Sequence, residues 1–185
     1  MEVDPSIHIE VHDGVYEPAE DSYLLLEAVE PRGGRMLDMG TGTGIIGLHA
    51  ARYGADVTAV DVDARAVENV RSNAAGNDLD IEVIQSDLFT EMQGRFAVIA
   101  FNPPYLPAGD DDIRWDGGPG GIATVRRFLN EAGGHLEKDG SMYLLLSTLG
   151  DVAGLLQEFQ GRYRFEQKRR LPLFFERLLV YEITR

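Results

Sequence analysis

Apolar runs and helical patterns alternate along most of this 185-residue chain, and this alternation restricts the fold more than any single motif does. Five apolar runs predict strands, at 35–39, 56–61, 81–85, 96–101 and 141–147. Several are apolar almost throughout, which is typical of parallel strands covered by helices on both faces. Helices are expected at 45–54, 63–76 and 121–137, with a candidate break at Gly133-Gly134. The pattern predicts an α/β protein with a parallel sheet.

Two further segments complete the predicted fold. Residues 19–30 carry apolar side chains at helical spacing, so a leading helix is expected to pack on the sheet. Near the end of the chain, two β-rich segments meet at Leu171-Pro172-Leu173, which favours antiparallel pairing. We therefore expect one Rossmann-like domain over 1–185, with a seven-stranded, mostly parallel sheet, one antiparallel strand and helices on both faces. In this division 1–34 form an N-terminal extension and helix, and 35–185 form the core.

Composition narrows the classes of function. The chain has no cysteine and four histidines without metal-ligand spacing, so no metal site is expected. No apolar run approaches the roughly 18 residues of a membrane span, and the N-terminus lacks the pattern of a secretory signal. These features favour a soluble, cytoplasmic protein that does not bind membranes.

The net charge of −14, with only two lysines among 17 cations, has two interpretations. Such a surface disfavours direct binding to nucleic acid, because affinity for phosphate depends on cationic side chains. It also resembles the lysine-poor surfaces of proteins from salt-loving organisms, and we favour this halophilic origin as the cause of the charge.

A glycine-rich loop follows the first predicted strand, in the segment LDMGTGTGIIG at 37–47. Gly40, Gly42 and Gly44 are expected at the carboxyl end of the sheet, where open α/β sheets bind ligands. Gly42 also begins a GxGxxG fingerprint, and Asp61 follows it at the end of the second strand, where it can accept hydrogen bonds from ribose hydroxyls. These residues alone fit a nicotinamide cofactor.

Two acidic positions favour a different cofactor. Asp38 precedes the glycine loop by two residues, where it would repel a pyrophosphate but attract a cationic amino group. Asp87 and Leu88 follow the third strand and can contact an adenine amino group and ring. S-adenosylmethionine has an amino group, an adenine and no phosphate. Each aspartate taken singly also fits a turn or helix cap in an acidic protein.

The segment FNPPY follows the fourth strand, which is the expected neighbour of the first. Each proline favours extended geometry in the residue before it, so the corner is stiff. It can aim the side-chain oxygen of Asn102 and the carbonyl of Pro103 at one point, as a pair of acceptors for a planar NH2 group. Pro104 stiffens this corner, and Tyr105 can supply an aromatic wall.

The motifs DMGTGTG, AVD, SD and NPPY, in this order, resemble those of class I methyltransferases that modify planar amide or exocyclic amino nitrogens. The segment VYEPAEDSYLLLEA at 15–28 is similar to the opening of the HemK-like glutamine methyltransferases of archaea and eukaryotes. That family uses S-adenosylmethionine to methylate the glutamine of the Gly-Gly-Gln motif in class I release factors. The resemblance covers nearly the whole chain and implies the same activity here.

The resemblance also implies roles for individual residues. Cofactor contacts are implied for Tyr16, Pro18, Ser22, Asp38, Gly40, Gly42, Gly44, Asp61, Asp87, Leu88 and Asn102. Catalysis is assigned to Asn102, Pro103, Pro104 and Tyr105, and substrate contacts to Glu20, Asn102, Pro103, Tyr105 and Trp115. From the residues alone, Glu20 equally fits an acidic helix start, and Trp115 equally fits packing within its own loop.

Family members in archaea and eukaryotes work with a small zinc-binding activator subunit. The third strand, IEVIQ at 81–85, is expected at a sheet edge that invites a partner strand, so a heterodimer is expected there. Other functions stay open. They are methylation of an exocyclic amino group of nucleic acid (adenine N6 or guanine N2), methylation of a protein lysine, and nicotinamide-dependent oxidoreduction or cofactor binding without catalysis.

Overall fold

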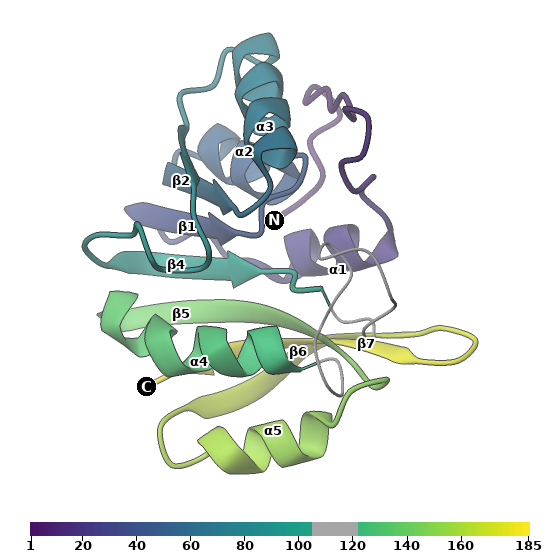
Figure 1. The fold of residues 1–185 in the computed structure, drawn as a ribbon, viewed down its shortest axis with the longest axis vertical. Coiled ribbons are helices and arrows are strands. Elements are labelled where there is room, and N and C mark those ends of the chain that lie inside the picture. The colour runs from purple at the N-terminus through teal and green to yellow at the C-terminus, as the bar shows by residue number, and fades with distance from the viewer. Residues whose placement is uncertain (105–121) are drawn as a thin grey trace.

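The computed structural model describes residues 1–104 and 122–185. Its strands form one sheet in the order β3-β2-β1-β4-β5-β7-β6 (Figure 1). The strands are β1 (Arg35–Met39), β2 (Asp56–Asp61), β3 (Glu82–Gln85), β4 (Phe96–Phe101), β5 (Leu136–Ser147), β6 (Arg164–Pro172) and β7 (Arg177–Thr184). Neighbouring strands from β3 to β5 pair in parallel, and β7 runs antiparallel to both β5 and β6. The predicted Rossmann-like sheet with one antiparallel strand is confirmed.

Helices cover both faces of this sheet. They are α1 (Glu20–Ala28), α2 (Ile45–Arg52), α3 (Ala64–Gly76), α4 (Ala123–His135) and α5 (Val152–Phe159). One apolar cluster joins α4 and α5 to the sheet through fully buried Phe128 and Leu155. A second cluster joins α1 and α2 to it through Leu25, Leu26 and Ile46. Within the described residues, no helix has both the length and the apolar character needed to cross a membrane.

Two predicted boundaries in the second half of the core are wrong. α4 continues through Gly133 and Gly134 instead of breaking there. Packing explains one of these glycines, because a Cβ at Gly133 would lie 2.8 Å from the hydroxyl oxygen of Tyr163. β5 begins at Leu136, which already pairs with Phe96, and not at 141. A register shift between Phe96 and Val98 absorbs this earlier start.

The C-terminal part also differs from the expectation. α5 was not predicted, although Asp151 caps it by accepting from the N–H of Gly154 at 2.9 Å. β6 extends through Pro172, and the turn lies after it, where the N–H of Leu173 donates to the carbonyl of Glu176 at 2.8 Å. Pro172 fits this strand because β6 is the edge of the sheet, where a missing N–H leaves no neighbour unpaired.

An extended N-terminal segment, 8–12, is held against α3 by three asparagine side chains. Asn69 and Asn73 of α3 and its C-cap Asn77 are spaced four apart and are at most 7% exposed. Each amide oxygen accepts a backbone N–H of the segment, from His12, Glu10 and His8 at 2.9, 3.0 and 2.8 Å respectively. Amide nitrogens donate back to its carbonyls. The segment is therefore fixed in place before the chain reaches α1.

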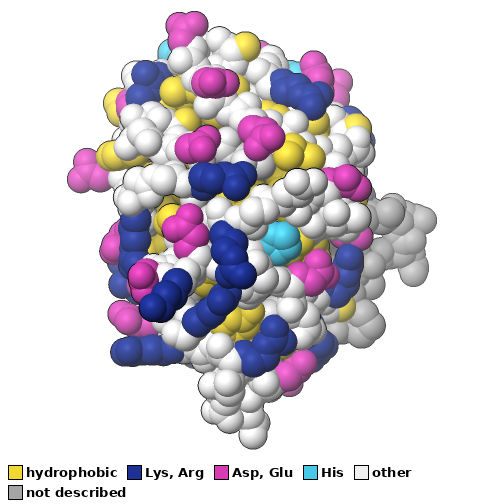
Figure 2. All heavy atoms as spheres, turned by 90° about the vertical axis from the view of Figure 1, so that its left-hand side faces the viewer, with side chains coloured by type: hydrophobic (Ala, Val, Ile, Leu, Met, Phe, Trp, Pro, Cys, Tyr) yellow, Lys and Arg dark blue, Asp and Glu magenta, His cyan; other side chains and the backbone are white. Residues whose placement is uncertain are grey.

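Charge is distributed unevenly over the molecule. Basic side chains gather on the lower half of the face shown in Figure 2, which lies at the amino ends of the parallel strands. Arg95, directly before β4, and Arg185, directly after β7, both donate to the carbonyl of Leu136 at 3.0 Å. Arg35, the first residue of β1, lies over the ring of Phe96 at 4.6 Å. This basic face is opposite the carboxyl ends of the strands, although the whole chain carries −14.

Candidate active site

The glycine loop and the NPPY corner lie side by side, because β1 and β4 are paired. Gly40, Gly42 and Gly44 have φ angles of 61, 56 and 86°, a region that favours glycine. A Cβ at Gly40 would lie 3.0 Å from the Phe101 ring and 3.7 Å from the Asn102 carbonyl oxygen. No larger residue therefore fits the loop at this point without displacing the end of β4.

Asp38 is buried beneath the glycine loop, with 2% of its surface exposed. Its Oδ2 accepts from the hydroxyl of Thr41 at 2.6 Å and from the N–H of Gly47 at 2.9 Å. Burial raises the pKa of Asp38 to about 7, and the two hydrogen bonds only partly oppose this effect. A cationic group bound beside the carboxyl would stabilise its charged form, so the site favours such a ligand.

Asp61 supports the loop from the end of β2. Its Oδ2 accepts from the N–H of Gly42, and its Oδ1 accepts from the N–H of Asp63, both at 3.0 Å. Burial is the largest of the effects that raise the pKa of Asp61. The carboxylate thus holds the glycine loop in shape at the position where a ribose was expected.

Asp87 and Leu88 follow β3 and differ in burial. The carboxylate of Asp87 is about half exposed and accepts from Arg127 of α4 at 2.8 Å. Leu88 is only 6% exposed and belongs to the core cluster, although its φ of 50° is unusual for a residue with a side chain. The Asp87 side chain therefore faces the surface, while the Leu88 side chain packs into the core beneath the turn.

The side chain of Asn102 has one satisfied end and one unsatisfied end. Its Nδ2 donates to Oδ2 of Asp21 at 3.0 Å. Its Oδ1 is buried and has no hydrogen-bond partner among the described residues. A carboxylate offers only acceptors, so it requires the nitrogen of the amide to face Asp21 and the oxygen to point away. An unpaired buried acceptor costs about 1–3 kcal/mol, which a bound donor would recover.

Asp21 joins this corner to the N-terminal extension. It is 3% exposed, and its Oδ1 accepts from the hydroxyl of Tyr16 at 2.8 Å and from the N–H of Ser22 at 2.7 Å. Asp21 was not among the site residues predicted from the sequence. A signal was nevertheless present, because Asp21 stands four residues before Leu25, which is fully buried on the same face of α1.

The remaining predicted residues are spread around this centre. Glu20 is exposed and lines a surface hollow of about 520 Å³ with Tyr23 and Leu171. Pro103 is buried, whereas Pro18 and Pro104 are partly buried. Tyr105 and Trp115 lie outside the described residues.

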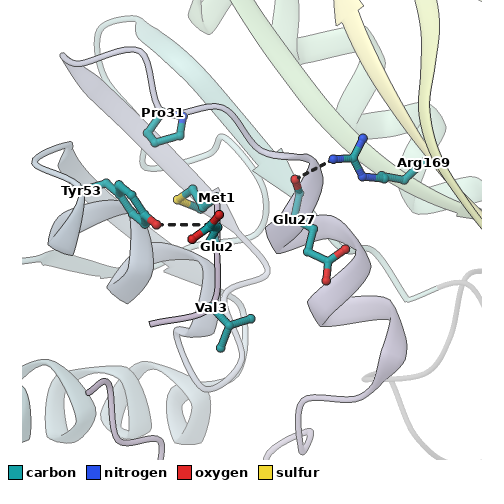
Figure 3. Close-up of a pocket in the computed structure, with 7 residues that line it drawn as sticks. All are labelled: Met1, Glu2, Val3, Glu27, Pro31, Tyr53 and Arg169. Atoms are coloured by element: carbon teal, nitrogen blue, oxygen red, sulfur yellow. Dashed lines mark hydrogen bonds between the residues drawn. The ribbon is translucent and has the colours of Figure 1, made fainter. Parts of the chain in front are cut away.

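A larger hollow, of about 840 Å³, contains none of the predicted site residues (Figure 3). It is lined by Met1, Glu2, Val3, Glu27, Pro31, Tyr53 and Arg169. The α-amino group of Met1 donates to the carbonyls of Leu26 and Val29 at 3.0 and 2.6 Å, so the N-terminus closes the end of α1 here. The α-amino group in this hollow therefore serves the fold, because its hydrogen bonds complete the end of α1.

Comparison with known proteins identifies the family. Residues 7–171 match the methyltransferase small domain. The chain belongs to this family. A candidate protein N5-glutamine methyltransferase of Methanocaldococcus jannaschii is 36% identical over 189 residues, which cover 97% of this chain and 96% of that protein. The fold and the family are those of S-adenosylmethionine-dependent methyltransferases.

Other relatives of this methyltransferase differ in their substrates. The release factor glutamine methyltransferase of Deinococcus radiodurans is 34% identical over 161 residues, which cover 74% of this chain and 58% of that protein. The ribosomal RNA small subunit methyltransferase C of Haemophilus influenzae is 29% identical over 157 residues, which cover 82% of this chain and 45% of that protein. Membership of the family therefore sets the reaction but leaves the methyl acceptor open.

Solved structures show the same two groups. The E. cuniculi Mtq2-Trm112 complex, which is responsible for methylation of the eRF1 termination factor, aligns with a TM-score of 0.76 and 26% identity over 92% of this chain and 98% of that chain. A T. thermophilus 16S rRNA N2 methyltransferase, solved with AdoMet and guanosine, aligns with a TM-score of 0.71 and 26% identity over 94% of this chain and 45% of that chain.

Proposed function

We propose that this methyltransferase transfers a methyl group from S-adenosylmethionine to the side-chain amide nitrogen of the glutamine in the Gly-Gly-Gln motif of a class I release factor. The observation that carries the proposal is the buried Oδ1 of Asn102, which lacks a partner among the described residues while Asp21 holds the other end of the amide. Relatives that share this activity by name support it.

The described residues fit the cofactor. Asp38, with its raised pKa, would receive the amino group, and Asp61 would accept from the ribose hydroxyls. The turn at Asp87 and Leu88 would meet the adenine, and the positive φ angles of the glycine loop allow close approach of its backbone. Residues 1–34 would cover the site, with contacts from Tyr16, Pro18 and Ser22. The cofactor supplies an electrophilic methyl group.

Placement of the acceptor nitrogen is the main task of the protein, because an amide nitrogen is a poor nucleophile. Asn102 Oδ1 and the Pro103 carbonyl would each accept one hydrogen of the substrate NH2 group, which orients its nitrogen. The same acceptors stabilise the positive charge that grows on this nitrogen as it is methylated. A group with fewer than two hydrogens leaves one acceptor buried and unpaired, so the pair also selects the substrate.

Replacing Asn102 with alanine tests this role. We expect Asn102→Ala to abolish methylation of the release factor, measured by mass spectrometry, while calorimetry shows S-adenosylmethionine binding within a few-fold of the wild type. A release factor whose Gly-Gly-Gln glutamine is replaced by alanine serves as the substrate control. Methylation of that control, or full activity of Asn102→Ala, contradicts the proposal.

Methylation of an amino group in ribosomal RNA is the second candidate, and the relatives that act on ribosomal RNA are the observation in its favour. The charge distribution argues against it, because the basic face of Figure 2 lies opposite the glycine loop. Protein lysine methylation is less well supported, since an ammonium must first lose a proton and the carboxylate of Asp21, which contacts Asn102, also binds Tyr16. Incubation with ribosomal RNA and with a Gln→Lys release factor tests both.

A small zinc-binding activator subunit is the proposed partner. β3 lies at the edge of the sheet, pairs only with β2 among the described strands, and carries half-buried Val83 and Ile84. Such an edge accepts a strand from another protein. The eRF1-methylating structure, which is itself a two-protein complex, supports this arrangement. Co-expression with and without the activator tests it, and equal yield and activity of the lone chain would contradict it.

A further inference from the structure

The turn between β6 and β7 presents two phenylalanines to solvent. Phe174 is 92% exposed and Phe175 is 87% exposed, and their rings meet edge to face with centroids 4.7 Å apart. The preceding residue, Leu173, is 38% exposed. Contiguous exposed apolar side chains of this size are characteristic of surfaces that bind another molecule.

This tip is fixed in position by hydrogen bonds at its base. The N–H of Leu173 donates to the carbonyl of Glu176 at 2.8 Å, and the carboxylate of Glu176 accepts from the hydroxyl of Ser147. The N–H of Arg177 donates to the hydroxyl of Thr148 at 2.8 Å. The rings are therefore held outward on a braced turn, which lowers the entropy lost when a partner covers them.

The tip also lies at the same edge of the sheet as the candidate active site. β4 is parallel to β5, β5 is antiparallel to β7, and β7 is antiparallel to β6. β6 therefore runs in the same direction as β4, and Pro172 lies at the same end of the sheet as Asn102. Figure 1 shows the β6–β7 turn projecting beyond that edge. A macromolecule bound at Asn102 can therefore reach the tip.

A hollow of about 520 Å³ lies between α1 and β6. It is lined by Leu171 of β6 and by residues at the start and outer face of α1, namely Ala19, Glu20, Tyr23, Leu24 and Glu27. Asp21 of the same helix holds Asn102. The side chains that line the hollow are apolar or acidic, so it suits a segment with apolar and basic side chains.

We propose that the Phe174-Phe175 tip and this hollow form the docking surface for the release factor, outside its Gly-Gly-Gln segment. The proposal rests on the proposed function and adds the surface that recognises the protein as a whole. The activator does not compete for it, because β3 and β6 are the two opposite edges of the sheet.

The test replaces both phenylalanines with serine in the full-length chain, in complex with the activator. Because both rings are exposed, the double variant Phe174→Ser/Phe175→Ser is expected to fold normally. We expect the KM for the intact release factor to rise about tenfold or more. The KM for a short peptide carrying Gly-Gly-Gln, and the affinity for S-adenosylmethionine, should stay unchanged. Tyr53→Ser, which removes a 50% exposed ring after α2, is the matched control.

Each outcome separates the docking role from the function on which it rests. An unchanged KM for the intact release factor overturns the docking surface but leaves glutamine methylation intact. A wild-type dimer that the double variant converts to monomer on sedimentation shows a contact between copies, and also overturns it. If wild-type protein methylates neither the release factor nor the peptide, the proposed function itself fails.

Discussion

Replacing Asp38 with asparagine should make the protein more stable and less able to bind its cofactor. Burial raises the pKa of this carboxyl from 3.8 to about 7. The folded state therefore binds the proton more tightly than the unfolded state does, and the free energy of unfolding falls as the pH rises from about 4 to about 7. Three pKa units at 1.36 kcal/mol each give a loss of about 4 kcal/mol at pH 8, which is an upper bound.

Asparagine keeps the local hydrogen bonds and removes the charge. Its Oδ1 can accept from Thr41 and Gly47 as the carboxylate Oδ2 does. We expect Asp38→Asn to gain about 1–4 kcal/mol of unfolding free energy at pH 8 and to lose the part of the pH dependence between 4 and 7 that comes from Asp38. Its affinity for S-adenosylmethionine should fall about 10- to 100-fold, because the amino group loses an ionic hydrogen bond.

Urea denaturation of the cofactor-free protein at pH 5, 7 and 8 measures the change in unfolding free energy. Calorimetry at pH 8 measures the change in affinity for S-adenosylmethionine. Asp87→Asn is a suitable control for the urea measurement alone, since that carboxylate is about half exposed. If the free energy of unfolding changes with pH in the same way for Asp38→Asn and the wild type, Asp38 ionises normally in the folded protein. Undiminished cofactor affinity would show that its charge has no role in binding.

Three further predictions concern other parts of the molecule. Asp21→Asn introduces an N–H donor that can pair with Asn102 Oδ1, which would rotate the Asn102 amide by half a turn. We expect kcat to fall about 10- to 100-fold while the affinity for the cofactor is retained. A kcat within twofold of the wild type contradicts this prediction. Asn73→Ala removes the hydrogen bonds to Glu10 and Thr43, so it should cost about 2–3 kcal/mol of stability and speed amide exchange over 8–12; unchanged exchange refutes the anchoring role. If the acidic surface reflects a halophilic origin, Tm should climb as potassium chloride approaches molar levels, and a flat or falling curve argues against it.

The order of strands and helices could be read from the sequence because it depends on neighbours along the chain. Apolar runs marked the buried parallel strands, and the glycines after β1 marked the carboxyl edge where ligands bind. The ends of the helices and strands were harder to predict from the sequence. Gly133 looked like a helix break, yet it sits inside α4 because Tyr163, thirty residues later, packs against it. α5 was missed even though Asp151 and the buried pair Leu155 and Phe159 are readable signals.

The active-site details divide in the same way. By itself the sequence determined the chemistry available at each strand end, with Asp38 near the end of β1, Asp61 at the end of β2 and Asn102 directly after β4. Only the tertiary structure decided that Asp21, 81 residues before Asn102, turns the amide so that its oxygen is unpaired. It also decided that Phe174 and Phe175 are exposed, although their apolar side chains by themselves favour burial. Periodicity records which face of an element is apolar, whereas a hydrogen bond between distant side chains exists only once their elements have docked.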